Sequence, residues 1–416
     1  MPLTPKLRIA FVTPEYVTEK TFDSGLATYI HRVAKALVGM GHEVHVVTLS
    51  EAESEFEHEG IRVHRIKVAR IWLELNRATR YRLATSIYLL GLSVRVYRKL
   101  NALNTRHLFD LLQFPYSRFS GLVSTLFLRV PHVVRASWYE AAWNDLTQTK
   151  PNLDARVVAA LERLQLRSSP YVCTPSQALQ KTLIEKMRLT DVRVIRSPSY
   201  DETCEWDYSN YEELLSGKSY VLFFGRFELR KGFHVLCQAL PRFLEQQPEA
   251  YAVLVGRDLQ STLASSMAAY ARELTSEHAE RVLILHRLPH AQLYPIIEEA
   301  RLIVLPSLMD NLPNACLEAM MLGKAVLGTR GASFEEMITD GENGFLVTPN
   351  SPDELGDKLI SVWTDPRLEA VAQAAKRRAG DFSSESAVSE LFSYYCEVLA
   401  GKEKASPRRL RKQVTT

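Results

Sequence analysis

The sequence predicts an α/β protein made of two doubly wound domains that face each other across a cleft. A chain of 416 residues usually divides into two domains of roughly 200 residues each. Short apolar runs alternate with helical patterns in both halves, which is typical of parallel strands joined by right-handed helical crossovers. The alternation starts at Leu7 and starts again near Ser219.

The first fifty residues already contain one strand–helix–strand unit. Leu7–Val12 predicts a buried strand, Ala27–Met40 has apolar residues at helical spacing, and Glu43–Leu49 predicts the next strand. Further strands of this half are expected at Ile61–Val68, Leu108–Gln113, His132–Ala136 and Tyr171–Cys173. Residues 1–200 are therefore expected to form an N-terminal domain.

The second half repeats the pattern after a polar stretch, Ser197–Gly217, which we interpret as the linker. A strand at Tyr220–Phe224 ends in a glycine, and a helix is expected from about Phe233. Later strands are expected at Ala252–Val255, Val282–Leu285, Leu302–Leu305, Ala325–Gly328 and Phe345–Val347. These elements predict a second domain over residues 201–383.

The C-terminal segment contains one more amphipathic pattern. Ser386–Leu399 has apolar residues along one helical face, so a helix over about 384–400 is expected to pack back on the N-terminal domain. Residues 401–416 become polar and basic and predict a disordered tail.

Composition excludes several classes of protein. The hydrophobic fraction of 46% and charged fraction of 24% are those of a globular protein, and a net charge of +3 does not by itself indicate a nucleic-acid partner. Five scattered cysteines without a C-x-x-C pair predict a reducing compartment and argue against a zinc cluster. Without a signal peptide or a long apolar run, a cytoplasmic location is expected, with at most peripheral contact at the inner face of a membrane.

The first candidate site is the loop from Gly225 to Gly232, between a strand and a helix. Glycine allows the backbone to turn close to a ligand. Arg226 and Lys231 bring two cations to the end of the strand, beside the positive end of the next helix. This arrangement suits a diphosphate, although a solvated basic turn explains the loop alone equally well.

The second candidate site begins where the strand at Leu305 ends and continues into a helix expected near Asn314. Asp310 and Glu318 lie on either side of that helix start, where their carboxylates can accept hydrogen bonds from ribose or sugar hydroxyls. The alternative is an N-cap aspartate and a surface glutamate.

Together these motifs resemble those of the family 4 retaining glycosyltransferases, the glycosyl transferases group 1, which have the two-domain GT-B fold. The family pattern is G-R-x(4)-K-G followed downstream by P-S-x(2)-E-x(7)-E-A-M. The matching residues are Gly225, Arg226, Lys231, Gly232, Pro306, Ser307, Asp310, Glu318, Ala319 and Met320. The likeness continues through 323–326 and 340–347, so it covers the whole second half.

The resemblance implies two Rossmann-like domains and a role for each motif residue. Arg226 and Lys231 would hold the donor pyrophosphate and stabilise the leaving group, Asp310 would contact the transferred sugar, and Glu318 would bind the ribose. The donor site it implies comprises Gly225, Arg226, Lys231, Asp310, Asn311, Leu312, Asn314, Ala315 and Glu318. Asp310 replaces the usual glutamate, and Pro313 stands where glycine is common.

The resemblance also implies that no cofactor is needed besides the nucleotide-diphosphate sugar, which is a co-substrate. The chain contains no D-x-D pair that would hold a divalent cation on the phosphates. In the family the leaving phosphate itself is thought to help deprotonate the acceptor hydroxyl. We therefore expect a metal-independent hexosyltransferase of glycan, polysaccharide or glycolipid biosynthesis.

The candidates on the acceptor side are weaker. Gly25 matches the second glycine of a family loop, where Ser24 replaces the first. The family histidine at the end of a later strand corresponds to Ser137, which leaves Ser137, Arg135 and Trp138 as sugar or acceptor candidates. His132 starts that strand, at the wrong end for a ligand, and is interpreted as structural.

Residues 62–106 are strongly basic, with eleven Lys and Arg residues and one acid, Glu74. Apolar residues recur among the cations at helical spacing. An amphipathic surface for anionic lipid or for a phosphorylated acceptor is one reading, and the solvated face of a core helix is the favoured one. A nucleic-acid partner is not expected, because no aromatic platform accompanies the charge.

Two other functions are kept open. A catalytically silent nucleotide-sugar-binding partner subunit would explain the missing histidine at Ser137. A sugar-nucleotide epimerase of the same fold would need a further acid and histidine set. Release of nucleoside diphosphate from a donor would distinguish the transferase from the silent binder.

Overall fold

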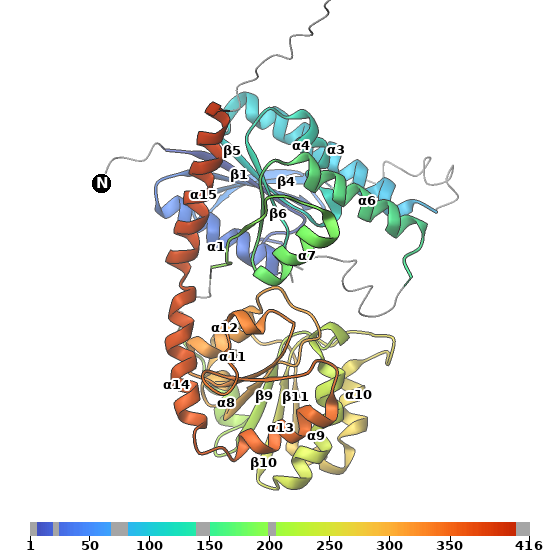
Figure 1. Ribbon diagram of the computed structural model, residues 1–416, viewed down its shortest axis with the longest axis vertical. Coiled ribbons are helices and arrows are strands. Elements are labelled where there is room, and N and C mark those ends of the chain that lie inside the picture. Colours follow the sequence, from blue (N-terminus) through green and yellow to red (C-terminus); the bar gives the residue numbers. More distant parts are fainter. Residues whose placement is uncertain (1–5, 20–24, 68–81, 139–149, 199–204, 405–416) are drawn as a thin grey trace, which may run out of the picture. The chain divides into compact units, whose positions relative to one another are not determined.

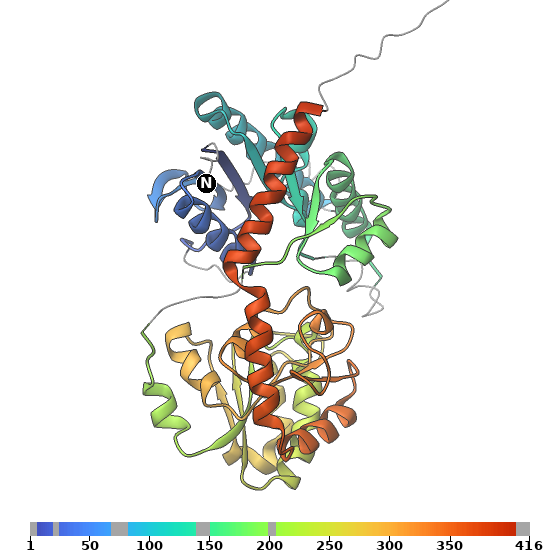
Figure 2. The ribbon, with the colours of Figure 1, turned by 60° about the vertical axis from the view of Figure 1, so that its left-hand side comes forward.

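The computed structural model describes residues 6–19, 25–67, 82–138, 150–198 and 205–404. They form two compact units (Figure 1, Figure 2). Unit 1 comprises Met1–Pro175, Leu179–Pro198 and Ala387–Thr416, and unit 2 comprises Ser176–Ala178 and Ser199–Ser386.

Unit 1 contains an eight-stranded sheet in the order β3-β4-β2-β1-β5-β6-β7-β8. Its strands are β1 Arg8–Thr13, β2 Glu43–Ser50, β3 Ser54–His58, β4 Ile61–Lys67, β5 Leu111–Pro115, β6 His132–Arg135, β7 Val172–Thr174 and β8 Arg193–Val194. All neighbours pair in parallel except β3 and β4, which form an antiparallel hairpin at the edge. The strand order reverses between β1 and β5, so a crevice is expected at their carboxyl ends.

Helices cover both faces of this sheet. Its helices are α1 Gly25–Gly39, α3 Ala84–His107, α4 Leu122–Phe127, α6 Leu153–Ser168 and α7 Gln177–Met187, with a 3₁₀ turn η1 Ser117–Phe119. Successive residues of a strand point to opposite faces. Accordingly, Ile9 and Phe11 of β1 pack with α1, whereas Ala10 and Val12 pack with α3, α6 and α7.

Unit 2 contains a six-stranded parallel sheet in the order β11-β10-β9-β12-β13-β14. Its strands are β9 Ser219–Phe224, β10 Ala250–Val255, β11 Val282–Leu285, β12 Leu302–Val304, β13 Val326–Thr329 and β14 Phe345–Val347. The order reverses between β9 and β12. Both candidate donor loops follow these two strands, so the predicted site lies at the switch point of the sheet, where ligands of such folds bind.

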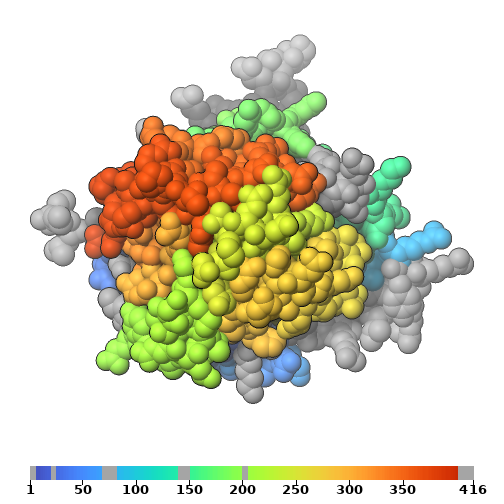
Figure 3. Space-filling view, turned by 90° about the horizontal axis from the view of Figure 1, so that it is seen from below, coloured from blue at the N-terminus to red at the C-terminus, as the bar shows by residue number. Residues whose placement is uncertain are grey.

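The helices of unit 2 also form two layers. They are α8 Ser209–Leu214, α9 Phe233–Gln246, α10 Met267–Leu274, α11 His290–Glu298, α12 Asn314–Met321, α13 Pro352–Trp363 and α14 Leu368–Ala379. One core joins α9, α10 and α13 to the sheet, the other joins α11 and α12 to its opposite face, and α14 contributes side chains to both. Figure 3 shows the orange-red α13 segment beside the yellow-green α9 on the surface.

The last helix, α15 Ser384–Lys404, belongs to unit 1 from Ala387 onward. Its Leu391 and Tyr395 are buried in the core that contains α1. The Tyr395 hydroxyl donates a hydrogen bond of 2.6 Å to Oε1 of Gln113 on β5. The helix continues to Lys404, so the prediction of a disordered tail is wrong for residues 401–404, and residues 405–416 lie outside the described residues.

The prediction of two doubly wound α/β domains is confirmed, as are the predicted strands to within a few residues. The linker prediction at Ser197–Gly217 is wrong for its second part. Residues 209–214 form α8, and Trp206 and Tyr211 pack on the core of unit 2. Polar residues surround these aromatic side chains in the sequence, so the sequence pattern did not indicate that they pack on a core.

Two sequence expectations concern the chain as a whole. Among the residues that the structure describes, no helix is long and apolar enough to cross a membrane. The described cysteines are unpaired, with Cys173, Cys237 and Cys316 buried and Cys396 exposed.

Candidate active site

Two loops at the switch point of unit 2 are locked together by their backbones. Leu308 N–H, after β12, donates to Arg230 C=O, after β9, at 2.9 Å. Gly232 has a φ of 66°, and a Cβ on it would lie 1.7 Å from the carbonyl oxygen of Pro306. Only glycine fits this close approach, so the Gly232 of the motif sets the position of one loop on the other.

Gly225 begins the first loop with a φ of 145°. Its N–H donates to Val255 C=O at 3.0 Å, which continues the pairing of β9 with β10 past the strand end. The Gly225 carbonyl would lie 1.7 Å from a Cβ on Gly256, so this second glycine is equally constrained. The chain therefore leaves β9 along a path defined by its neighbour, and Arg226 follows at the strand's carboxyl end.

The charged groups of the two loops form one network. Lys231 Nζ donates to Oδ2 of Asp310 and joins the β9 loop to the β12 loop. Burial raises the pKa of Asp310, but the charges of Lys231 and Arg230 outweigh it and hold that pKa below its usual value. Asp310 is therefore an ionised acceptor at neutral pH.

Two arginines share one acid beside this pair. Nη2 of Arg226 lies 3.2 Å, and Nη2 of Arg230 2.8 Å, from Oε1 of Glu228. With Lys231 and Asp310, the loops bring together three cations and two carboxylates and so have a positive surplus. Arg226 is more than a third exposed, so its guanidinium remains accessible to an anionic ligand.

The start of α12 adds a partial positive charge. Pro313 is the N-cap and has no side-chain cap partner, and its carbonyl accepts from Cys316 N–H at 3.0 Å. A residue that caps a helix through its carbonyl does not need its own N–H, so Pro313 fits this position without loss. The first-turn residues Asn314 and Ala315 are half-buried at the positive end of the helix.

The backbone before α12 adopts an unusual conformation. Leu312 has a φ of 103°, a region that favours glycine, and its side chain is buried in the core of unit 2. Such strain persists only where the surrounding packing imposes it, and it clusters at ligand sites. Oγ of Ser333, from the loop after β13, donates to Asp310 C=O at 3.1 Å and supports the same loop.

The structure brings most predicted donor residues together. Gly225, Arg226, Lys231 and Asp310 lie in the two locked loops, and Asn311 N–H donates to Oδ1 of Asp310 at 3.0 Å. Leu312 is a buried support. Glu318 is half-buried on α12, one turn beyond the helix start.

Sequence reasoning missed Glu228, Arg230 and Ser333 as members of the network. Glu228 and Arg230 lie inside the first motif, so their charge was visible, but their pairing depends on the turn between them. Ser333 lies 23 residues from Asp310, and no spacing rule connects the two.

The acceptor candidates all lie in unit 1. Gly25 is the exposed first residue of α1, and Ser24 lies outside the described residues. Ser137 and Trp138 follow β6 and are half-buried.

An arginine that binds the acceptor is expected to reach the surface, but Arg135 does not. It is 1% exposed, and its guanidinium stacks over the Tyr29 ring at 4.1 Å and donates to Oγ of Ser197 at 3.1 Å. Alternation along β6 turns its side chain into the core. We therefore interpret Arg135 as a structural residue of unit 1.

Unit 1 contains two hollows, and one of the acceptor candidates, Trp138, lines the first of them. One has a volume of about 710 Å³ and is lined by Trp138, Arg118 and the first turns of α3 and α6. The other, of about 660 Å³, is lined by Arg118 and by residues that follow β1 and β2. Arg118, which was not predicted, follows β5 and lines both hollows at the carboxyl ends of the strands.

The loop of Arg118 is held by buried polar side chains of α6. Arg118 has a φ of 59°, and its N–H donates to Oε1 of Glu162 at 2.7 Å. Gln165 accepts from Gly121 N–H at 3.1 Å and donates to Pro115 C=O at 2.8 Å. Among the described residues, the Arg118 guanidinium itself makes no hydrogen bond or ion pair, so it is available to a ligand.

Asp154 at the start of α6 caps the start of α3 and lines the same hollow. Its carboxylate accepts from Thr85 N–H at 2.8 Å and from Ser86 N–H at 2.9 Å. Burial raises the pKa of Asp154, but these hydrogen bonds outweigh it and lower the pKa below its usual value. A carboxylate of this kind stabilises the fold above its unfolded pKa of about 3.9, and that contribution is lost as the pH falls through its lower folded pKa.

We expect Asp154→Ala to lower the free energy of unfolding by about 2 kcal/mol at pH 7, because it leaves the buried N–H of Ser86 and the partly buried N–H of Thr85 without their acceptor. Urea denaturation of both proteins at pH 7 and pH 3 measures the difference. It should be large at pH 7 and shrink at pH 3. A difference that is the same at both pH values would show that the ionised carboxylate does not cap the helix.

The basic segment 62–106 is partly neutralised in the structure. Arg62 pairs with Glu43, Arg65 with Glu19, and Lys99 with Glu53 and Glu55. These pairs support the interpretation of a solvated surface. Residues 68–81 lie outside the described residues, and contact with a membrane stays a prediction of the sequence.

Comparison with known proteins agrees with this architecture. The family described as "Glycosyl transferases group 1" matches residues 206–379, and the "Glycosyl transferase 4-like domain" matches residues 24–198. The chain is a GT4-like glycosyltransferase of the GT-B fold. In this glycosyltransferase, the group 1 match contains both locked loops of unit 2.

Full-length relatives extend the comparison. An uncharacterized glycosyltransferase of Methanocaldococcus jannaschii is 24% identical, covering 86% of this chain and 90% of the relative. Sucrose-phosphate synthase from Thermosynechococcus elongatus superposes with a TM-score of 0.77 at 18% identity, over 95% of this chain and 100% of that one. Anabaena HepE in complex with UDP-glucose gives a TM-score of 0.68 at 19% identity, over 95% and 100% of the two chains.

Proposed function

We propose that this glycosyltransferase moves a hexose from a nucleotide-diphosphate sugar to an acceptor hydroxyl with retention of anomeric configuration and without a divalent cation. The observation that carries the proposal is the cluster of three cations in the loop after β9 at the switch point of unit 2, in which Arg226 and Arg230 pair with Glu228 and Lys231 pairs with Asp310. A pyrophosphate needs such a concentration of donors. The UDP-glucose bound by the structurally similar Anabaena protein supports a donor of this class.

Each group has a defined task in this reaction. The diphosphate gains negative charge as its bond to the sugar breaks, and Arg226, Lys231 and the start of α12 would stabilise that charge. Asp310 would accept hydrogen bonds from the sugar hydroxyls while Lys231 keeps it ionised. Glu318 on α12 would bind the ribose, and the leaving phosphate would take the acceptor proton.

The acceptor would bind in unit 1, at the carboxyl ends of β1, β5 and β6. The hollows around Arg118 and Trp138 support this assignment, because their 710 and 660 Å³ suit a sugar-sized molecule. The exposed Arg118 guanidinium favours an acceptor with an anionic group near the reacting hydroxyl.

A screen of nucleoside-diphosphate sugars tests the reaction. We expect one donor to raise the melting temperature in the presence of EDTA and, with an acceptor extract, to release nucleoside diphosphate. The anomeric configuration of the product, read by NMR, tests retention. Activity that EDTA abolishes and Mg²⁺ restores would contradict the metal-independent mechanism.

The same screen separates the rival functions. A silent binding subunit would be stabilised by a donor but would release no diphosphate with any acceptor. An epimerase would change the sugar of the donor without a second substrate. If neither nucleotide sugars nor nucleoside diphosphates bind, the donor site is wrongly assigned.

A further inference from the structure

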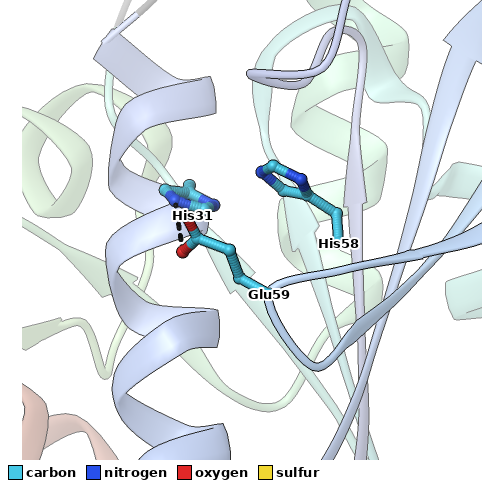
Figure 4. A group of neighbouring side chains, drawn as sticks. All are labelled: His31, His58 and Glu59. Carbon is cyan, nitrogen blue, oxygen red and sulfur yellow. Dashed lines mark ion pairs between the residues drawn. The ribbon is translucent and has the colours of Figure 1, made fainter.

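Three potential metal ligands meet at the edge of unit 1, on a surface that the proposed reaction does not use. His31 lies on α1, and His58 and Glu59 lie at the turn between β3 and β4 (Figure 4). Their donor atoms all lie within 4.8 Å of one another. Figure 4 shows the His58 and Glu59 side chains directed from the turn towards His31.

The distances fit a tetrahedral ion. Nε2 of His31 lies 3.6 Å from Oε2 of Glu59. Two ligands at about 2.0–2.1 Å from Zn²⁺ in a tetrahedron are about 3.4 Å apart, so a small movement of the side chains closes the site. Two imidazoles and a carboxylate form a set that zinc prefers, with the fourth position open to water.

A buried group orients the first ligand. The hydroxyl of Tyr16 lies 3.0 Å from Nδ1 of His31, and Tyr16 is fully buried. When the hydroxyl accepts a hydrogen bond from Nδ1–H, Nε2 has no proton and its lone pair is available to a metal ion beside Glu59. Metal-bound histidines almost always have such a partner on the second nitrogen.

The turn that presents the other two ligands is unusual. Glu59 and Gly60 connect β3 to β4 with φ values of 49° and 77°. Two-residue turns with both φ values positive favour Asn-Gly or Asp-Gly, and glutamate is disfavoured there. A Cβ on Gly60 would lie 2.9 Å from Val38 of α1, so the turn is pressed against the helix.

The Glu59 carboxylate already forms an ion pair with a lysine. Nζ of Lys35 lies 2.8 Å from Oε2 of Glu59, on a side chain that is 63% exposed. A long exposed lysine can move into solvent when an ion takes its place. Lys35 is therefore a competitor of the metal.

A second cluster, Glu43, His45 and His107, is a weaker candidate for a metal site. Glu43 holds Arg62 at 2.8 Å, and His45 is fully buried with its Nδ1 at 2.9 Å from Nε2 of His64.

We propose that His31, His58 and Glu59 bind one Zn²⁺ and that this ion fastens the β3–β4 hairpin to α1. Through Tyr16, the site also reaches the segment between β1 and α1. The proposed reaction assigns this zinc no role, so metal-independent transfer and a bound zinc are compatible.

Titration of the EDTA-treated full chain with ZnCl₂, followed by calorimetry and thermal melting, tests the site. We expect one Zn²⁺ per chain, a higher melting temperature, and visible d–d absorption when CoCl₂ replaces ZnCl₂. Absence of stoichiometric binding would overturn the proposal.

Three variants make the test specific. Glu59→Asn installs a residue that the turn prefers, so it should fold at least as well as the wild type and bind Zn²⁺ at least about tenfold more weakly. His31→Gln should weaken binding similarly. Lys35→Ala should tighten it, whereas a simple Lys35–Glu59 ion pair without metal predicts no such gain.

Two control variants exclude binding elsewhere. His286→Gln removes an exposed histidine of unit 2, and His107→Gln disrupts the second cluster. Both should bind Zn²⁺ like the wild type. Wild-type affinity in Glu59→Asn and His31→Gln, or its loss in His107→Gln, would assign the metal to another site and overturn the proposal.

Discussion

Lys231→Met is expected to lower kcat/KM by about two to three orders of magnitude, because it removes the cation that joins the two donor loops. The methionine keeps most of the length of the side chain and removes the ammonium group, so the change is mainly one of charge. Steady-state kinetics with the identified donor, and calorimetry with its nucleoside diphosphate, measure the effect. Arg242→Ala, which removes one cation of the exposed Arg242–Asp357 pair of unit 2, should leave both unchanged.

A second role of Lys231 has to be separated from the first. Lys231 also neutralises the partly buried Asp310, and Lys231→Met leaves that carboxylate without its nearest cation, at a cost of about 1–3 kcal/mol in unfolding free energy. Adding Asp310→Asn should recover this stability but not the activity. Because a nucleoside diphosphate lacks the transferred sugar, its affinity does not depend on Asp310, and recovery of this affinity in the double variant would mean that Lys231 serves only Asp310 and would contradict its assignment to the pyrophosphate.

Gly232→Ala is expected to have the largest effect on stability, lowering the free energy of unfolding of unit 2 by at least about 4 kcal/mol. Its Cβ would lie 1.7 Å from the Pro306 carbonyl oxygen, on a backbone with a φ of 66°. Neither atom can rotate away, so one donor loop must move. A loss of this size corresponds to roughly 8 °C or more in melting temperature for a domain of this size.

Gly331→Ala separates steric overlap from backbone strain. Gly331 has a φ of 77°, but a Cβ there meets no atom within 4 Å. It should therefore cost only about 1 kcal/mol, the penalty of a left-handed alanine. Equal losses in the two variants would show that the contact with Pro306 is unimportant. We would then measure binding of the nucleoside diphosphate to Gly232→Ala below the melting temperature of this variant. This measurement shows whether the two loops still form the donor site.

The sequence by itself predicted the two parallel-sheet units and most strands, such as Val282–Leu285 and Phe345–Val347, which have the predicted bounds. Buried parallel strands are short apolar runs, so they can be recognised from the local sequence alone. The edge strand β3 was missed because its residues, Ser54–His58, are mostly polar and lie at the border of the sheet. The helix α8 was missed for the same reason.

The donor motifs were also predictable, because Arg226, Lys231 and Asp310 lie at strand ends, and the carboxyl ends of parallel strands meet at one edge. The conformation of the loops decided which of these charged groups form ion pairs. Glu228 sits between Arg226 and Arg230, and Ser333 reaches the Asp310 carbonyl from the loop after β13. Such contacts depend on backbone paths that no spacing in the sequence encodes.

The burial of Arg135 and the meeting of His31 with His58 and Glu59 were decided only by the tertiary structure. Alternation along β6 turns Arg135 under Tyr29, although its position at a strand end suggested a ligand site. Cysteine spacing gave no sign of a zinc site, because the proposed ligands are two histidines and a glutamate. A helix and a hairpin 27 residues apart in sequence bring them together. Local pattern thus determines the elements and the residues at their ends, whereas packing between elements determines which side chains meet.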